Sequence, residues 1–156
     1  PKPRLFIIGA VHIAQALILL ADVADYEIIL IDPRDHFATK KRFSNCKIIN
    51  EWPDEALSKF NLDKSSHLVT LTHDPKIDDL ALIFCMKKNI GYIGSLGSKK
   101  THNKRCERLI KKGFDEIELS KIHAPIGLDI KAKTPAEIAT SILAEIINYR
   151  RKSHDE

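Results

Sequence analysis

Two histidines and one aspartate stand where their side chains can meet in a cleft. His12 follows a short apolar run at residues 5–8, and His73 and Asp74 follow a second such run at residues 68–71. Two imidazoles and a carboxylate that converge can orient a polar ring or transfer protons. The alternative is that each histidine is an ordinary hydrogen-bonded loop residue. A metal site is disfavoured, because the three residues come from separate loops and show no local zinc-binding spacing.

The loop around His12 has the strand–turn–helix context of a dinucleotide-binding fingerprint. It reads Gly9-Ala10-Val11-His12-Ile13-Ala14. Gly9 permits a tight turn and Ala14 permits close packing, but Val11 stands where the fingerprint has its middle glycine. A β-branched side chain there holds the backbone away from a pyrophosphate. Binding of NAD(P) or another nucleotide is therefore expected to be weakened. The alternative is a turn that only connects strand to helix.

An acidic residue lies where folds of this kind bind a ribose. Asp32 comes 23 positions after Gly9, and ribose-binding acids lie about 20 residues beyond the glycine turn. Arg34 is close enough in sequence to bind a phosphate. The alternatives are that Asp32 is a turn residue before Pro33 and that Arg34 pairs with Asp32 or Asp35 at the surface.

A loop rich in glycine and serine precedes a charged segment. Gly94-Ser95-Leu96-Gly97-Ser98 combines two glycines, two hydroxyls and an expected helix N-terminus, which together can bind an anion. Lys99 and Lys100 add positive charge. The P-loop pattern is absent, and a flexible surface turn is the alternative.

The helix expected over residues 98–112 is strongly basic. Its basic side chains lie along nearly one face: Lys100, Lys104, Arg108, Lys111 and Lys112. A solvated helix surface is favoured, with docking to an acidic partner as the alternative. Nucleic acid is disfavoured as a partner, because no aromatic residue interleaves with the basic ones.

Residues 123–129 form an irregular, rather apolar segment that begins at His123. It is expected to provide a last short strand and a loop that closes the site. No serine occupies a nucleophile elbow, and no cysteine has an evident base beside it. No catalytic residue is therefore assigned.

Short buried strands alternating with helices are expected to position these residues. Continuous apolar runs are typical of parallel strands buried on both faces. They occur at residues 5–8, 28–31, 68–71 and 90–93, with a weaker one at 46–49. The last helix begins with a capping box at Thr134-Pro135-Ala136-Glu137. The expected fold is α/β: a three-layer, doubly wound, Rossmann-like parallel sheet with strand 5–8 at its centre. Ligands bind such sheets beyond the carboxyl ends of the strands.

Composition agrees with a small globular protein. The chain has 156 residues, of which 44% are apolar, and we expect a single domain at residues 1–150 with a frayed polar tail at 151–156. No apolar run reaches the roughly 18 residues that span a bilayer, so no membrane association is expected. Three separated cysteines cannot form a disulfide framework, which favours reduced thiols and a cytoplasmic location. The net charge of +4 does not by itself indicate nucleic-acid binding.

With these segments in place, the chain resembles the C-terminal domain of the xanthine dehydrogenase accessory proteins, which are molybdenum-cofactor insertion chaperones. The matching stretches follow one another over nearly the whole chain: LFIIGAVHIAQAL (5–17), IDPRDHFAT (31–39), WPDEAL (52–57), LTHDPKIDD (71–79), YIGSLGSKKTH (92–102) and IHAPIGLDIKAKTPAEIATSILAEII (122–147).

The resemblance implies a Rossmann-like domain that binds molybdenum cofactor as its cargo. It implies help with sulfuration of the cofactor and with its insertion into a xanthine dehydrogenase-type enzyme. A sulfur-donating desulfurase and a second copy of the chain, in a homodimer, are further candidate partners. The positions of interest carried over by motif are Gly9, His12, Asp32, Arg34, His73, Asp74, Gly94, Ser95, Gly97, His102, His123 and Asp129.

The sequence departs from the family in two respects. The family typically has GAGH where this chain has Gly9-Ala10-Val11-His12, and its full-length members also carry an N-terminal domain. The chain is therefore expected to be one domain of such a protein or a one-domain relative. The favoured interpretation is a cofactor-handling protein without turnover of its own. An NAD(P)-dependent oxidoreductase, or a nucleotide-sensing or protein-binding module, on the same fold is the alternative.

Overall fold

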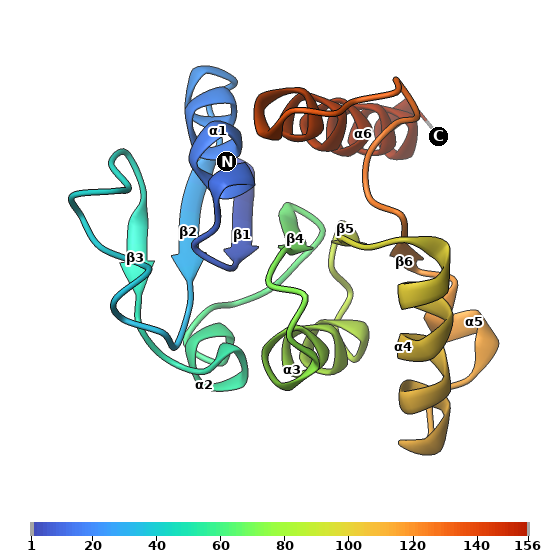
Figure 1. Cartoon of the computed structure of the whole chain (residues 1–156). Helices are drawn as coiled ribbons and strands as arrows, with labels where there is room; N and C mark the ends of the chain where they lie inside the picture. The colour runs from blue at the N-terminus through green and yellow to red at the C-terminus, as the bar shows by residue number, and fades with distance from the viewer. Residues whose placement is uncertain (1, 156) are drawn as a thin grey trace.

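The computed structural model describes residues 2–155, and this range contains six strands and six helices (Figure 1). They alternate along the chain except that β3 follows β2 directly and α5 follows α4 directly. The strands are β1 (Arg4–Ile8), β2 (Glu27–Ile31), β3 (Lys47–Ile49), β4 (Ser66–Thr70), β5 (Tyr92–Ser95) and β6 (Ile122–His123). The helices are α1 (His12–Val23), α2 (Pro53–Leu57), α3 (Pro75–Met86), α4 (Lys99–Lys111), α5 (Glu116–Leu119) and α6 (Pro135–Asp155).

All six strands form one parallel sheet in the order β3-β2-β1-β4-β5-β6. Strand β1 pairs with β2 on one side and with β4 on the other, so the predicted central position of residues 5–8 is confirmed. The winding reverses between β1 and β4, and the loops that follow these two strands are therefore neighbours at the carboxyl edge of the sheet.

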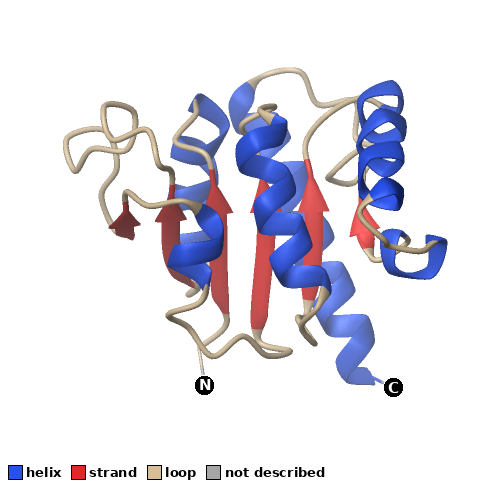
Figure 2. Ribbon diagram, turned by 90° about the horizontal axis from the view of Figure 1, so that it is seen from below, coloured by secondary structure: helices blue, strands red, loops and turns tan. Residues whose placement is uncertain are grey.

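Helices cover both faces of the sheet and make the predicted three layers. Helices α1 and α6 lie on one face, and α2 and α3 lie on the other (Figures 1 and 2). Alternate residues of β1 serve the two cores: Leu5 and Ile7 pack towards α1 and α6, while Phe6 and Ile8 pack towards α2 and α3. This burial on both faces explains why the strand sequences are continuous apolar runs.

Strand β5 lies two residues later than expected. The sequence predicts a strand at residues 90–93 that ends at Gly94, whereas β5 covers Tyr92–Ser95. A Cβ at Gly94 would lie 2.6 Å from Ile126 Cδ1 and 2.6 Å from the Tyr92 hydroxyl. Gly94 is therefore a strand residue that lets its neighbours pack closely, and not a loop residue.

The last helix begins as predicted but ends later. The Glu137 amide donates to Thr134 Oγ1 (3.1 Å), and Glu137 Oε1 accepts from the Thr134 amide (3.0 Å), so the capping box is confirmed. Helix α6 continues to Asp155, so residues 151–155 are helical where a frayed tail was expected. Among the described residues, no helix combines the length and the apolar character that a membrane span requires.

Candidate functional site

The predicted ribose-binding acid is fully engaged inside the protein. Asp32 is buried at the end of β2, where it accepts hydrogen bonds from the Ala10 amide (2.8 Å) and the Arg34 amide (2.9 Å). The Arg34 guanidinium adds Nε (2.9 Å) and Nη2 (2.8 Å) in a bidentate ion pair. Burial alone would raise the pKa of Asp32, but the bonds from Arg34 and Ala10 outweigh it and hold the pKa below its ordinary value.

These hydrogen bonds join the loop after β1 to the loop after β2 and occupy the carboxylate that a ribose would need. Both Asp32 oxygens already have two donors, and Arg34 also stacks over Phe37, with 4.6 Å from the guanidinium carbon to the ring centroid. Gly9 adopts a φ of +118°, and a Cβ there would lie 2.8 Å from Thr72 Cγ2. The glycine therefore allows the first loop to lie against the loop after β4.

The loop after β4 is organised by a buried carboxylate. Asp78, in the first turn of α3, accepts from Thr72 Oγ1 (2.7 Å) and the His73 amide (3.0 Å). Burial raises the pKa of Asp78 to about 6, even though these bonds oppose the rise. His73 has a φ of +65°, and its side chain is exposed. Asp74 caps α3 by accepting from the Lys76 amide (3.0 Å).

A small cavity with several charged residues around it lies between the start of α3 and one face of α4. It has a volume of about 90 Å³, and we call it the Arg105 cavity. The residues that matter for its chemistry are His73, Asp78, Asp79, Thr101, Lys104, Arg105 and Arg108. Of the predicted constellation, only His73 lines this cavity. His12 is exposed on α1, with Nδ1 3.3 Å from Gln15 Oε1.

The predicted anion-binding loop is divided between the sheet and a helix cap. Ser95 is buried in β5, where its hydroxyl lies 2.6 Å from Thr70 Oγ1. Gly97 has a φ of +134° and makes the turn out of the sheet. Ser98 caps α4 by accepting from the Thr101 amide (3.2 Å). Leu96, Gly97 and Ser98 of this loop lie beyond the strand, next to Lys99.

The predicted basic face of helix α4 is exposed at Lys100, Lys104, Lys111 and Lys112, as expected, and only its Arg108 is partly buried. A further basic residue, outside the predicted face, lies inside the protein. Arg105 is only 2% exposed. Arg108 makes a bidentate ion pair with Asp79 (2.8 and 3.2 Å). Among the described residues, no group of three His, Cys, Asp or Glu side chains is arranged to hold a metal ion.

One cysteine does have a histidine beside it, contrary to the expectation. Cys106 Sγ lies 3.4 Å from His102 Nε2, because positions i and i+4 share one helix face. His102 Nδ1 lies 3.1 Å from Arg105 Nη1. Burial raises the pKa of the Cys106 thiol, and the Arg105 charge opposes this only in part. The shift favours the neutral thiol over the thiolate.

His123 lies in an aromatic cluster near α6, away from His12 and His73. Its ring stacks on Tyr92, with a centroid distance of 4.6 Å, and contacts Tyr149 edge-on at 4.8 Å. The Tyr92 hydroxyl donates to Glu145 Oε1 (2.6 Å), which also accepts from the Gly127 amide (3.2 Å). This cluster attaches β5, β6 and the segment after β6 to α6.

Replacing Tyr92 with phenylalanine is expected to lower the free energy of unfolding by about 2 kcal/mol, since a largely buried carboxylate loses a donor. Urea unfolding monitored by circular dichroism measures the change. Tyr149→Phe is the matched control, because its hydroxyl has no hydrogen bond within the described residues, and it should change stability by less than about 0.5 kcal/mol. Equal effects would contradict the role given to the Tyr92 hydroxyl.

A larger groove follows the carboxyl ends of β5 and β6. The segment after β6 is docked by the Ile126 amide, which donates to the Ser95 carbonyl (3.2 Å). The last short strand, β6, ends at His123, at the start of the segment 123–129 in which it was expected. The groove measures about 430 Å³, and its walls include Leu96, Lys99, Ile126, Leu128, Lys131 and Ile138. We call it the carboxyl-edge groove. Asp129, at its rim, pairs with Lys131 (3.3 Å).

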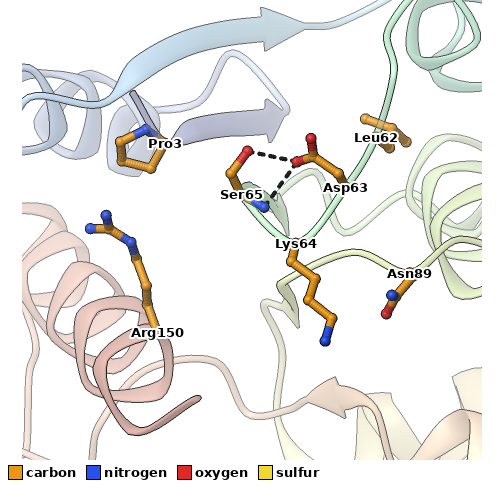
Figure 3. Close-up of a pocket in the computed structure, with 7 residues that line it drawn as sticks. All are labelled: Pro3, Leu62, Asp63, Lys64, Ser65, Asn89 and Arg150. Atoms are coloured by element: carbon orange, nitrogen blue, oxygen red, sulfur yellow. Dashed lines mark hydrogen bonds between the residues drawn. The ribbon is translucent and has the colours of Figure 1, made fainter. Parts of the chain in front are cut away.

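The most voluminous depression that we describe, about 640 Å³, lies at the opposite edge of the sheet. It is bordered by Pro3 before β1, the turn before β4 and Arg150 of α6 (Figure 3). Within it, the Asp63 carboxylate accepts from the Ser65 amide and hydroxyl. Because parallel sheets of this type bind ligands at their carboxyl ends, its size alone does not make it the functional site.

Comparison with known proteins identifies the family. Residues 5–146 match the family model described as the XdhC Rossmann domain. The chain belongs to this family. The fold of this chain is also similar to that in a crystal structure described as a xanthine dehydrogenase from Bacillus halodurans. The TM-score is 0.85 at 31% sequence identity, over 99% of this chain and 46% of that chain.

Curated relatives of this XdhC Rossmann domain include two that carry functional names. One, from Bacillus subtilis, is named as a probable xanthine dehydrogenase subunit and is 33% identical over 97% of this chain and 44% of its own length. The molybdenum cofactor insertion chaperone PaoD of Escherichia coli is 27% identical over 100% of this chain and 43% of its own length. The chain thus spans less than half of either relative.

The sequence analysis did not identify three buried charged residues where α3 and α4 meet. Arg105, Asp78 and Asp79 were not singled out. A signal existed for Arg105, because it lies four positions before the buried Leu109 and so shares its inward helix face. Asp78 lies in the first turn of α3, and Asp79 follows it directly. A carboxylate near a helix N-terminus is ordinarily interpreted as a response to the helix dipole.

Proposed function

We propose that this domain binds molybdenum cofactor and takes part in its insertion into a xanthine dehydrogenase-type enzyme. The observation that carries the proposal is the carboxyl-edge groove in a member of this family. The groove lies where parallel sheets bind ligands, and its volume of about 430 Å³ falls in the range typical of small-molecule sites. The names of the Bacillus subtilis and Escherichia coli relatives support the same role.

The chemistry of the groove walls suits a flat heterocycle with an anionic end. Leu96, Ile126 and Leu128 offer apolar surface for a pterin ring. Lys99 and Lys131 offer positive charge for the phosphate and dithiolene ends of the cofactor. These side chains are not proposed to catalyse a reaction. They bind and orient the cargo.

The competing nicotinamide-dependent function is less well supported. The Asp32 carboxylate is buried, and each of its oxygens already accepts two hydrogen bonds from the protein. It is therefore not available to a ribose hydroxyl. Val11 occupies the middle position of the fingerprint and caps α1 without a side-chain hydrogen bond. A dinucleotide would therefore lack both its ribose acid and the close backbone approach to its pyrophosphate.

Three finer parts of the proposal rest on the family resemblance. These are sulfuration of the cofactor before insertion, a desulfurase as sulfur donor, and assembly as a homodimer. A cytoplasmic location is proposed on the cysteine content instead. The three cysteines in the described residues are free thiols, and Cys85 is fully buried. If sulfur were relayed through this domain, Cys106 would be the better candidate of the helical cysteines, because it is partly exposed beside His102.

Binding of the cofactor tests the proposal directly. The protein is mixed anaerobically with molybdenum cofactor released from a purified molybdoenzyme, and bound pterin is measured by fluorescence after gel filtration and oxidation. The wild-type chain should retain pterin. Lys99→Ala should weaken the affinity about tenfold or more, as expected for the loss of one charge-assisted contact.

The neighbouring substitution Lys100→Ala is the control, because this exposed lysine is outside the groove, and it should change the affinity less than about twofold. Calorimetric titration with NAD and AMP completes the test. Micromolar binding of NAD together with no retention of pterin would contradict the proposal and favour an NAD(P)-dependent oxidoreductase function.

A further inference from the structure

Arg105 is a buried cation without an ionic partner. Its side chain is 2% exposed, yet none of the salt bridges among the described residues includes it. Nη2 donates to the Leu96 carbonyl (3.2 Å), and Nη1 lies 3.1 Å from His102 Nδ1. Nε has no hydrogen-bond partner within the described part of the chain. Burying a charge in this way is costly unless a counter-charge accompanies it.

The two nearby acids are already committed to other groups. Asp79 holds both of its oxygens on the Arg108 guanidinium. Asp78 uses its oxygens to accept from the backbone and hydroxyl of Thr72 and from the His73 amide. Both acids act on Arg105 only at longer range. The counter-charge of Arg105 is thus not supplied by a direct contact within the described residues.

The cavity that Arg105 lines has the size and the donors for a single tetrahedral oxyanion. Its volume of about 90 Å³ is roughly three times the space that a water molecule occupies in the liquid. Lys104 is exposed and Thr101 also lines the cavity, with its hydroxyl 3.1 Å from Ser98 Oγ. A guanidinium carries its N–H groups in a planar fork that matches the geometry of phosphate oxygens.

We propose that the Arg105 cavity binds a phosphoryl group, either as inorganic phosphate or as the phosphate of a small monoester. Arg105 supplies the buried charge, Lys104 supplies a second charge from the solvent side, and the Arg108–Asp79 pair holds α4 against α3. The site is separate from the carboxyl-edge groove, because the two share no lining residue. The proposal therefore does not depend on the cofactor assignment.

Thermal unfolding and calorimetry with inorganic phosphate and with glycerol phosphate test the site. Added at ten times its Kd, either ligand should raise the Tm of the full chain by about 3 °C or more. Sodium chloride at matched ionic strength should not. A shift with glycerol phosphate alone identifies a monoester as the ligand, and a shift with both identifies phosphate itself. No shift with either, or an equal shift with chloride, overturns the proposal.

Two variants separate binding from folding. Arg105→Met keeps the volume of the side chain and removes an unpaired buried charge, so the fold should persist in phosphate-free buffer while phosphate affinity falls at least about tenfold. Lys104→Ala changes an exposed residue and should weaken affinity about three- to tenfold, whereas Lys100→Ala should leave it unchanged. Unaltered phosphate affinity in both Arg105→Met and Lys104→Ala would refute the site, and Lys104→Ala alone decides if Arg105→Met does not fold.

Discussion

Replacing Asp32 with alanine is expected to lower the free energy of unfolding by about 3 kcal/mol, a large share of the stability of a small domain. The substitution leaves the Ala10 amide, in a residue that is 1% exposed, without its acceptor. It also leaves the Arg34 guanidinium without its bidentate partner. Urea unfolding measures the loss. Asp35→Ala is the control, because the Asp35 side chain is 86% exposed, and it should cost less than about 0.5 kcal/mol.

The pH dependence of this difference gives a second readout. The pKa of Asp32 in the folded chain lies below its ordinary value of 3.8. Its ionic contribution to stability is therefore complete above pH 3.8 and is lost as the pH falls through the lower folded value. The difference between the wild type and Asp32→Ala should be constant from pH 7 to about pH 5 and should shrink below pH 4. A variant as stable as the wild type but impaired in NAD binding would instead make Asp32 a cofactor residue.

The architecture was predictable because burial on both faces leaves a plain mark on the sequence. The runs at Leu5–Ile8 and Leu68–Leu71 contain no charged residue, so they indicate parallel strands covered by helices, and the sheet order confirms it. The error at β5 comes from a contact between residues far apart in the sequence. Gly94 looks like a loop residue in the sequence, but in the fold it makes room for Ile126, which lies 32 positions later.

The polar residues were harder to assign, because pairing depends on packing between distant elements. That Arg34 would pair with Asp32 was one alternative open in the sequence, and the structure selects it. The ion pair of Arg108 with Asp79 needs α3 and α4 side by side, and a pattern within one helix cannot reveal it. Likewise, His12 and His73 follow adjacent strands, yet their side chains do not line a common cavity among those described.

Replacing Gly91 with alanine is expected to lower the free energy of unfolding by about 3 kcal/mol or more. A Cβ at Gly91 would lie 2.2 Å from the Lys64 carbonyl oxygen and 3.1 Å from the Ser66 carbonyl oxygen. Both are backbone atoms, one just before β4 and one in its first residue, so neither can move aside as a side chain can. The Gly91 amide also donates to the Ser66 carbonyl (2.8 Å), which joins the starts of β4 and β5.

Gly113→Ala is the informative comparison, since the two glycines are constrained in opposite ways. Gly113 has a φ of +99°, but no described atom would lie within 4 Å of its Cβ. It should therefore cost only the left-handed conformation, about 1–2 kcal/mol. A methyl group at Gly91 should push β4 and β5 apart at their starts and so shift their carboxyl ends as well. These ends lead into α3 and α4, which border the Arg105 cavity. Gly91→Ala should thus weaken phosphate binding as well as stability, whereas Gly113→Ala should affect stability alone. If Gly91→Ala proves no more costly than Gly113→Ala in urea unfolding, the close approach of Gly91 to Lys64 does not limit the fold.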